Sequence, residues 1–164
     1  MEIRNFTKFD FPSVRTIYEQ GIKTGNATFQ EKAKDWNDWN SSFLASCRLV
    51  AVSNKNVVGW AALSLVSTRS VYSGVAEVSV YVAPDEHGTG VGHSLLRKLV
   101  FSAEHEGLWT LQASILPENH ASIAIHFKNG FKHVGIREKL GKLNCVWRDV
   151  ALLERRSKIV GAEK

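Results

Sequence analysis

The sequence has few residues of the kinds that build disulfide frameworks or metal sites. Its two cysteines, Cys47 and Cys145, are far apart and form no CxxC pair, so neither a disulfide framework nor a zinc knuckle is indicated. We expect both to be buried, reduced thiols. The histidines show no HExxH or other paired spacing, and we predict no metal site.

Long apolar runs are also missing. No stretch approaches the ~18 consecutive apolar residues that a membrane helix needs, and the N-terminal residues Met1 to Asn5 lack the apolar core of a signal peptide. These observations predict a cytoplasmic protein with no membrane partner.

The composition is that of an ordinary globular protein. Of 164 residues, 44% are hydrophobic and 23% are charged, which leaves no case for disorder and predicts one domain over residues 1–164. The net charge of +5 modestly favours anionic ligands. Basic residues gather only at Arg155, Arg156 and Lys158, which we interpret as a solvated tail, and no nucleic-acid partner is expected.

The pattern of apolar residues predicts a mixed α/β fold with about four helices and seven strands. Helices are expected from Asp10 as N-cap, over 35–45, over 94–106, and through Ile123 to Phe127. Strands are expected over 2–5, 49–52, 57–66, 75–82, 109–115, 131–136 and 145–153, with Gly141 in the turn between the last two. In the strand over 75–82, alternation places Glu77, Ser79 and Tyr81 on one face.

A glycine-rich segment separates the strand over 75–82 from the helix over 94–106. Its residues are His87, Gly88, Thr89, Gly90, Val91 and Gly92. Glycines at alternate positions allow a tight turn with exposed N–H groups, and the following helix adds unpaired N–H groups and the positive end of its dipole. The segment is therefore a candidate seat for a diphosphate.

Three other interpretations compete for this segment. A P-loop would continue with Lys and Ser or Thr after the last glycine, but Gly92 is followed by His93 and Ser94. A dinucleotide site would have GxGxxG and an acidic residue ~20 positions later, whereas the spacing here is GxGxG and residues 107–112 offer no such acid. The third is a loop that needs glycine only for its geometry.

Two segments in order, Val78 to Gly92 and Asn119 to Phe131, resemble the GNAT superfamily of N-acetyltransferases. Within it, Ala27-Thr28-Phe29, Arg69 to Tyr72, Ala76 to Tyr81 and His126 resemble the phosphinothricin acetyltransferase subgroup, so the resemblance covers almost the whole chain. It implies a mixed, mostly antiparallel sheet of seven strands, with a splay between the strands over 75–82 and 109–115.

The resemblance also implies acetyl-CoA as the cofactor, with its pantetheine arm in the splay. Backbone groups of Val82 would pair with pantetheine, and the N–H of Val80 would polarise the thioester carbonyl. The implied cofactor-binding residues are Val80, Val82, His87, Gly88, Thr89, Gly90, Val91, Gly92, His93, Asn119 and Ser122. The family usually has Arg or Gln in place of His87, so either cofactor affinity is weaker or His87 points outward.

Direct transfer to an amine needs a base, a stabilised oxyanion and a proton for the departing thiolate. Glu77 is our candidate base, with a structural carboxylate as the alternative. His126 is our candidate general acid or orienting group, with a packing histidine as the alternative, and Ser79 and Tyr81 are further possible donors.

For the acceptor, Arg69 and Tyr72 lie in the loop before the reactive strand, where a guanidinium can clamp a carboxylate. Phe29 would supply an apolar wall and Thr28 a hydroxyl. The favoured acceptor is thus a small amino acid or a toxic analogue such as phosphinothricin, methionine sulfoximine or methionine sulfone. A protein N-terminus, a polyamine and a non-catalytic acyl-CoA-binding module remain alternatives, and the resemblance suggests a homodimer.

Overall fold

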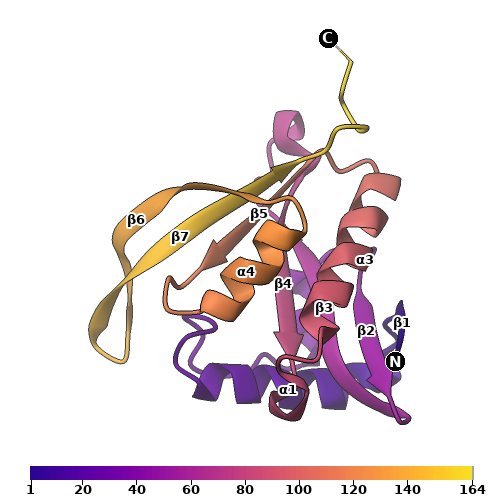
Figure 1. Cartoon of the computed structure of the whole chain (residues 1–164), viewed down its shortest axis with the longest axis vertical. Helices are drawn as coiled ribbons and strands as arrows, with labels where there is room; N and C mark the ends of the chain where they lie inside the picture. The colour runs from indigo at the N-terminus through magenta and orange to yellow at the C-terminus, as the bar shows by residue number, and fades with distance from the viewer. Residues whose placement is uncertain (164) are drawn as a thin grey trace.

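The computed structural model describes residues 1–163, which form one twisted sheet with helices on both faces (Figure 1). The strands are β1 (Glu2–Asn5), β2 (Leu49–Ser53), β3 (Asn56–Leu65), β4 (Val75–Val82), β5 (Thr110–Ile115), β6 (Lys132–Leu143) and β7 (Val146–Arg156). The helices are α1 (Phe11–Lys23), α2 (Trp36–Ser42), α3 (Val91–His105) and α4 (His120–Lys128), with short 3-10 turns at Lys8–Asp10, Ser70–Tyr72 and Pro84–Glu86.

The seven strands lie in the order β1-β2-β3-β4-β5-β7-β6. All neighbours within residues 1–163 are antiparallel except β4 and β5, which run parallel. The mixed seven-stranded sheet, the four α-helices and the splay expected from the sequence are therefore confirmed. None of the helices described is long and apolar enough to cross a bilayer.

The alternation of β3 divides the core between the two faces of the sheet. Ala61 and Leu63 pack with Leu95 and Leu99 of α3 on one face. Trp60 packs with Val14 of α1 on the other face, where α2 also contributes Trp39. On β4, Val78 belongs to the α3 side and Tyr81 to the α1 side, so the predicted division of this strand is confirmed.

Helix ends differ from the sequence-based bounds for local reasons. Asp10 precedes α1, but its carboxylate does not cap that helix: it accepts from Thr7 N at 2.7 Å and pairs with Arg4 at 2.8 Å. Helix α2 ends at Ser42 instead of residue 45, because Phe43 is extended and Leu44 N donates to Leu63 O. Helix α3 begins at Val91, directly after the left-handed Gly90.

The position predicted for the turn between the last two strands is wrong. Gly141 lies inside β6, paired with Arg148, and the turn is formed by Asn144 and Cys145 with φ of 49° and 64°. The expectation of a buried thiol is consequently wrong for Cys145, which is exposed, while Cys47 is partly buried and both are free. The β6–β7 hairpin extends well beyond the helices (Figure 1).

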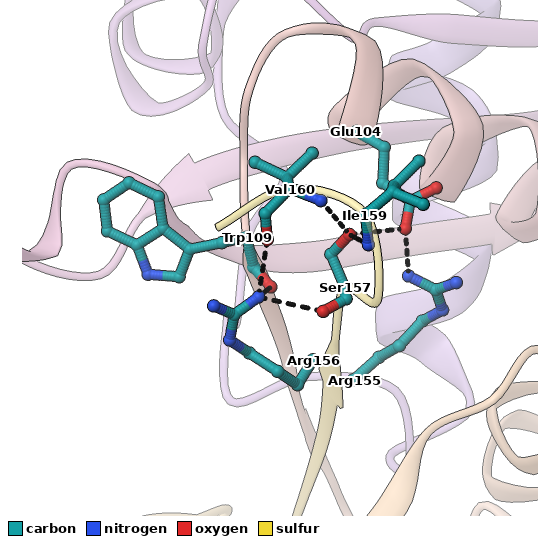
Figure 2. A network of polar contacts seen from close by, with 7 residues as sticks. All are labelled: Glu104, Trp109, Arg155, Arg156, Ser157, Ile159 and Val160. Carbon is teal, nitrogen blue, oxygen red and sulfur yellow. Dashed lines mark hydrogen bonds and ion pairs between the residues drawn. The ribbon is translucent and has the colours of Figure 1, made fainter. Parts of the chain in front are cut away.

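The basic residues at the end of β7 form a polar clamp (Figure 2). Arg155 Nη1 and Ser157 Oγ each donate to Glu104 Oε1 of α3 at 2.9 Å. Arg156 Nη1 donates to the carbonyls of Trp109 and Ser157 at 3.2 and 2.9 Å. The interpretation as a solvated tail is therefore wrong for both arginines, which fasten the end of the chain to α3 and to the start of β5.

Candidate active site

The central feature of the site is the gap between β4 and β5. Their parallel pairing covers only Val75 to Glu77 against Thr110 to Gln112, and beyond Glu77 the two strands diverge. Strand β4 nevertheless continues to Val82 and β5 to Ile115. Backbone groups that would pair across the sheet are thus left open along both strands.

The register with β3 decides which groups of β4 face the gap. Val82 lies opposite Gly59, and Ala83 N donates to Val58 O, so Val82 and Gly59 form a non-hydrogen-bonded pair. The N–H and C=O groups of Val82, and by alternation those of Val80, therefore point away from β3 and toward the gap. An extended ligand lying there can pair with this edge as an added strand.

A cavity of about 280 Å³ occupies the gap. Strands β4 and β5, the loop after α1, helix α4 and the β6–β7 hairpin all contribute to its walls. The lining residues are Ala27, Thr28, Phe29, Glu77, Val78, Ser79, Val80, Tyr81, Ala113, Ser114, Ile115, Leu116, Asn119, Ser122, His126, Leu140 and Val150. The structure thus brings the predicted Glu77, Val80, Asn119, Ser122, His126, Thr28 and Phe29 together.

The Glu77 carboxylate lies where the strands part. Its Oε1 accepts from Gln112 Nε2 at 3.0 Å and from Ser114 Oγ at 2.9 Å, both from β5. Two donors on one oxygen hold the carboxylate in one orientation and leave Oε2 without a protein partner among the hydrogen bonds of residues 1–163. Gln112 and Ser114 were not predicted from the sequence, although their alternate positions on β5 place them on one face.

His126 of α4 is 3% exposed and has a defined tautomer. Its Nδ1 lies 2.7 Å from Ser122 O, and because a carbonyl only accepts, Nδ1 carries the proton. Burial lowers the pKa of His126, and the bond to Ser122 opposes this effect. In the neutral ring, Nε2 is therefore an unprotonated acceptor, and it is buried without a hydrogen-bond partner among residues 1–163.

Tyr81 is fixed on the opposite side of the cavity. Its ring stacks on Trp60 and meets Tyr18 edge-on, each with ring centroids 4.9 Å apart. Burial raises the pKa of Tyr81, as does the nearby Tyr18, while the Thr28 hydroxyl lowers it. The Tyr81 hydroxyl is consequently protonated at physiological pH.

The glycine-rich loop has the geometry expected of an anion seat. Gly88 and Gly90 have φ of 79° and 90°, which side chains rarely adopt. The N–H groups of Gly88, Gly90, Val91, Gly92 and His93 have no hydrogen-bond partner within residues 1–163. Thr89 Oγ1 donates to Glu86 O at 2.7 Å, and His93 Nδ1 lies 3.0 Å from Asn129 Nδ2 of the loop after α4.

His87 does not reach into the anion seat. Its Nε2 donates to Val82 O at 3.0 Å, so the ring folds back onto the end of β4. The ring is exposed, as an outward orientation requires, but it also bonds a carbonyl on the edge of the gap. The expected effect of His87 on cofactor affinity stays a prediction.

Arg69 and Tyr72 lie outside the cavity. Both are exposed in the loop between β3 and β4, and the Arg69 guanidinium lies over the Tyr72 ring, 5.4 Å from its centroid. Among the residues that line the cavity, Glu77 is the one with a charged side chain, and no arginine or lysine accompanies it.

Leu140 is a further residue of the cavity that was not predicted from the sequence. Strand β6 carries two extra residues between Arg137 and Gly141 relative to β7, and Lys139 N donates to Asp149 Oδ1 at 2.8 Å in this bulge. The bulge re-aims Leu140, which lines the cavity. No local sequence signal marks such a bulge.

Comparison with known proteins agrees with this geometry. The profile of the acetyltransferase (GNAT) family matches residues 5–131. Phosphinothricin N-acetyltransferase of Alcaligenes faecalis is 31% identical over 89% of this chain and 77% of its own length. L-methionine sulfoximine/L-methionine sulfone acetyltransferase of Pseudomonas paraeruginosa is 30% identical over 93% of this chain and 92% of its own.

A solved structure shares the fold over nearly the full chain. The phosphinothricin acetyltransferase of Sinorhizobium meliloti, in complex with AcCoA, superposes with a TM-score of 0.90 at 27% identity, covering 99% of this chain and 91% of that one. Together with the family profile, the similarity settles the classification: this chain is a member of the GNAT family of acetyltransferases.

Proposed function

We propose that this protein transfers the acetyl group of acetyl-CoA directly to the amine of a small amino acid or a toxic analogue of one. Phosphinothricin, methionine sulfoximine and methionine sulfone are the analogues that the named relatives suggest. One observation carries the proposal: beyond Glu77 the strands β4 and β5 part, so that a fixed carboxylate and unpaired backbone groups line one cavity.

The residues fit acetyl-CoA. The N–H groups of Gly88 and of Gly90 to His93 suit a diphosphate. The backbone groups of Val80 and the N–H of Val82 suit the amide groups of a pantetheine arm, while Val82 O is bonded to His87. Asn119 and Ser122 flank the cavity from α4. When bound, acetyl-CoA supplies an activated acyl thioester.

Glu77 acts as the base. Its Oε1 is held by Gln112 and Ser114, and Oε2 is available to take the proton of an acceptor ammonium, directly or through a water molecule. The N–H of Val80, which faces the gap, donates to the oxygen on which negative charge develops.

His126 orients the thiol end of the cofactor and does not donate the proton to the departing thiolate. Its Nε2 has no proton in the neutral ring, because Nδ1–H is committed to Ser122 O. The proton for the departing thiolate comes instead from a hydroxyl of the cavity, Ser79 or Tyr81.

A second acceptor class is favoured by one observation. With Arg69 outside the cavity and no other cation lining it, an amine without a carboxylate is accommodated as well as an amino acid. If Arg69 binds an amino-acid acceptor, the carboxylate of that acceptor has to lie outside the cavity.

The protein is further proposed to act in the cytoplasm as a homodimer. Support comes from its two free thiols and from apolar side chains, about half exposed, on the projecting β6–β7 hairpin. These side chains are Val134, Ile136, Val146 and Trp147.

The test is a thiol-release assay with acetyl-CoA over a panel of amines. The panel pairs each amino acid with its decarboxylated amine: methionine sulfone with 3-(methylsulfonyl)propylamine, for example, beside phosphinothricin and a polyamine. Faster turnover of the amino acid, lost in Arg69→Ala, supports the amino-acid acceptor. Equal turnover of an amino acid and its decarboxylated amine would favour acceptors without a carboxylate. Binding of acetyl-CoA without turnover of any amine would refute acetyl transfer.

A further inference from the structure

Arg148 of β7 bonds to two segments that flank the cavity, although it does not line the cavity itself. Its Nη1 donates to Gly25 O at 2.9 Å, and its Nη2 donates to Asn26 Oδ1 at 2.7 Å and to Glu118 Oε2 at 3.1 Å. The Arg148 side chain is 17% exposed, and its bonds to Gly25 and Asn26 are partly buried, whereas the Glu118 side chain is 56% exposed and its bond faces water.

Gly25 and Asn26 begin the segment that forms the acceptor side of the cavity. Helix α1 ends at Lys23, Gly25 turns the chain with φ of 71°, and Thr28 and Phe29 follow on the cavity wall. No helix or strand includes residues 24–35, so this segment depends on contacts with the rest of the fold. Arg148 supplies two of them, across more than a hundred residues of sequence.

Glu118 lies on the opposite side, directly before α4. Its own backbone N–H and then the Arg148 guanidinium hold the pKa of Glu118 below its usual range. The next residue is Asn119, whose Oδ1 accepts from Ser122 N at 3.2 Å and caps α4. The same guanidinium thus contacts the acceptor segment and the start of the helix that carries His126.

Phe29 packs against the β6–β7 hairpin at the residue pair that includes Arg148. Gly141 pairs with Arg148 across β6 and β7, and a Cβ at Gly141 would lie 3.0 Å from Phe29 Cε1. Glycine therefore lets the ring lie directly on the hairpin, where Leu143 and Val150 pack beside it. The polar contact and the apolar contact fix the acceptor segment at one place.

We propose that Arg148 is a positioning residue for the transfer reaction: it fixes the acceptor wall at Thr28 and Phe29 relative to the start of α4 at Asn119. This inference rests on the proposed acetyl transfer. Its consequence follows from geometry, because a displacement of about 1 Å between two reacting groups costs on the order of 10²-fold in rate.

Steady-state kinetics of Arg148→Ala tests the proposal. The kcat/KM for the acceptor is expected to fall by about 10- to 100-fold, with the KM for acetyl-CoA nearly unchanged. Arg155→Ala is the matched control, since it removes a guanidinium of similar burial, paired at 2.9 Å with Glu104 away from the cavity. Equal losses for both substrates, or the same loss in the control, would show a merely structural role and overturn the proposal.

Amide hydrogen exchange gives a readout that needs no turnover. Exchange at residues 25–29 is expected to accelerate in Arg148→Ala and, to a smaller extent, in Asn26→Ala, which removes one of the two bonds to the acceptor segment and leaves the contacts of Arg148 with Gly25 and Glu118 in place. Unchanged exchange in both variants overturns the proposal. If the wild type acetylates no amine, transfer fails as the function, while accelerated exchange still supports the positioning role of Arg148.

Discussion

Replacing Glu77 by Gln tests the chemistry most directly. Glutamine keeps the size of the side chain and an oxygen that can accept from Gln112 or Ser114, but it cannot take a proton from an ammonium group. We expect kcat to fall by about 10²–10⁴-fold, which corresponds to roughly 3–5 kcal/mol of transition-state stabilisation. The KM for acetyl-CoA should change little, because the free edge of β4 is untouched.

Ser114→Ala gives a graded companion to that variant. It removes one of the two donors to Glu77 Oε1, the one at 2.9 Å. Ser114 is exposed, so water can replace the lost bond, and the cost should not exceed about 1 kcal/mol, or roughly fivefold in kcat. The remaining bond from Gln112 keeps the carboxylate near its position.

The assay for both variants is thiol release at saturating acetyl-CoA, with the acceptor varied and pH stepped from acidic to alkaline. The expected order of kcat is wild type, then Ser114→Ala, then Glu77→Gln. A Glu77→Gln enzyme as fast as the wild type at neutral pH would remove Glu77 as the base. A Ser114→Ala enzyme as slow as Glu77→Gln would instead identify Ser114 as a direct participant.

Three further outcomes can be measured. Burial lowers the folded-state pKa of His126 below its unfolded value of 6.5. The stability contributed by the neutral ring is therefore complete above pH 6.5 and declines as pH falls below that value. Between pH 7.5 and 5.5, the melting temperature of His126→Gln should fall less than that of the wild type. His87→Ala frees Val82 O and should tighten acetyl-CoA binding by about two- to tenfold in calorimetry, whereas weaker binding would assign His87 a direct contact. Arg155→Met leaves the Glu104 carboxylate, only 15% exposed, with the Ser157 hydroxyl but without a cationic partner, and should cost about 1–3 kcal/mol in denaturant unfolding. An unchanged midpoint would contradict the clamp.

Local patterns were enough to predict much of the site. The period of two along β4 placed Glu77 and Tyr81 on one face, and the glycines before α3 marked a turn with exposed N–H groups. His126 could be named from sequence, but its role as an acceptor could not, since the tautomer depends on its distance to Ser122 O.

Contacts between residues far apart in the sequence could not be predicted from local patterns. Gly141 was assigned to a turn because glycine often forms turns, whereas here it makes room for Phe29, and Asn144 and Cys145 form the turn. Asn144 was the missed signal, since asparagine tolerates positive φ. Arg69 shows the same limit: a loop residue close to the reactive strand in sequence lies outside the cavity in space.

The gap in the sheet explains why one small cavity can serve a two-substrate reaction. Glu77 and Tyr81 belong to the face covered by α1, and His126 comes from α4 near the α3 face, yet all line the same cavity. A continuous sheet would separate these groups with a layer of paired backbone. Because pairing stops at Glu77, the cavity connects the two faces of the sheet at this point. In the proposed reaction, an acyl group on the α4 side would meet an amine on the α1 side here. Any change that extends the pairing of β4 with β5 should therefore abolish transfer before it unfolds the protein.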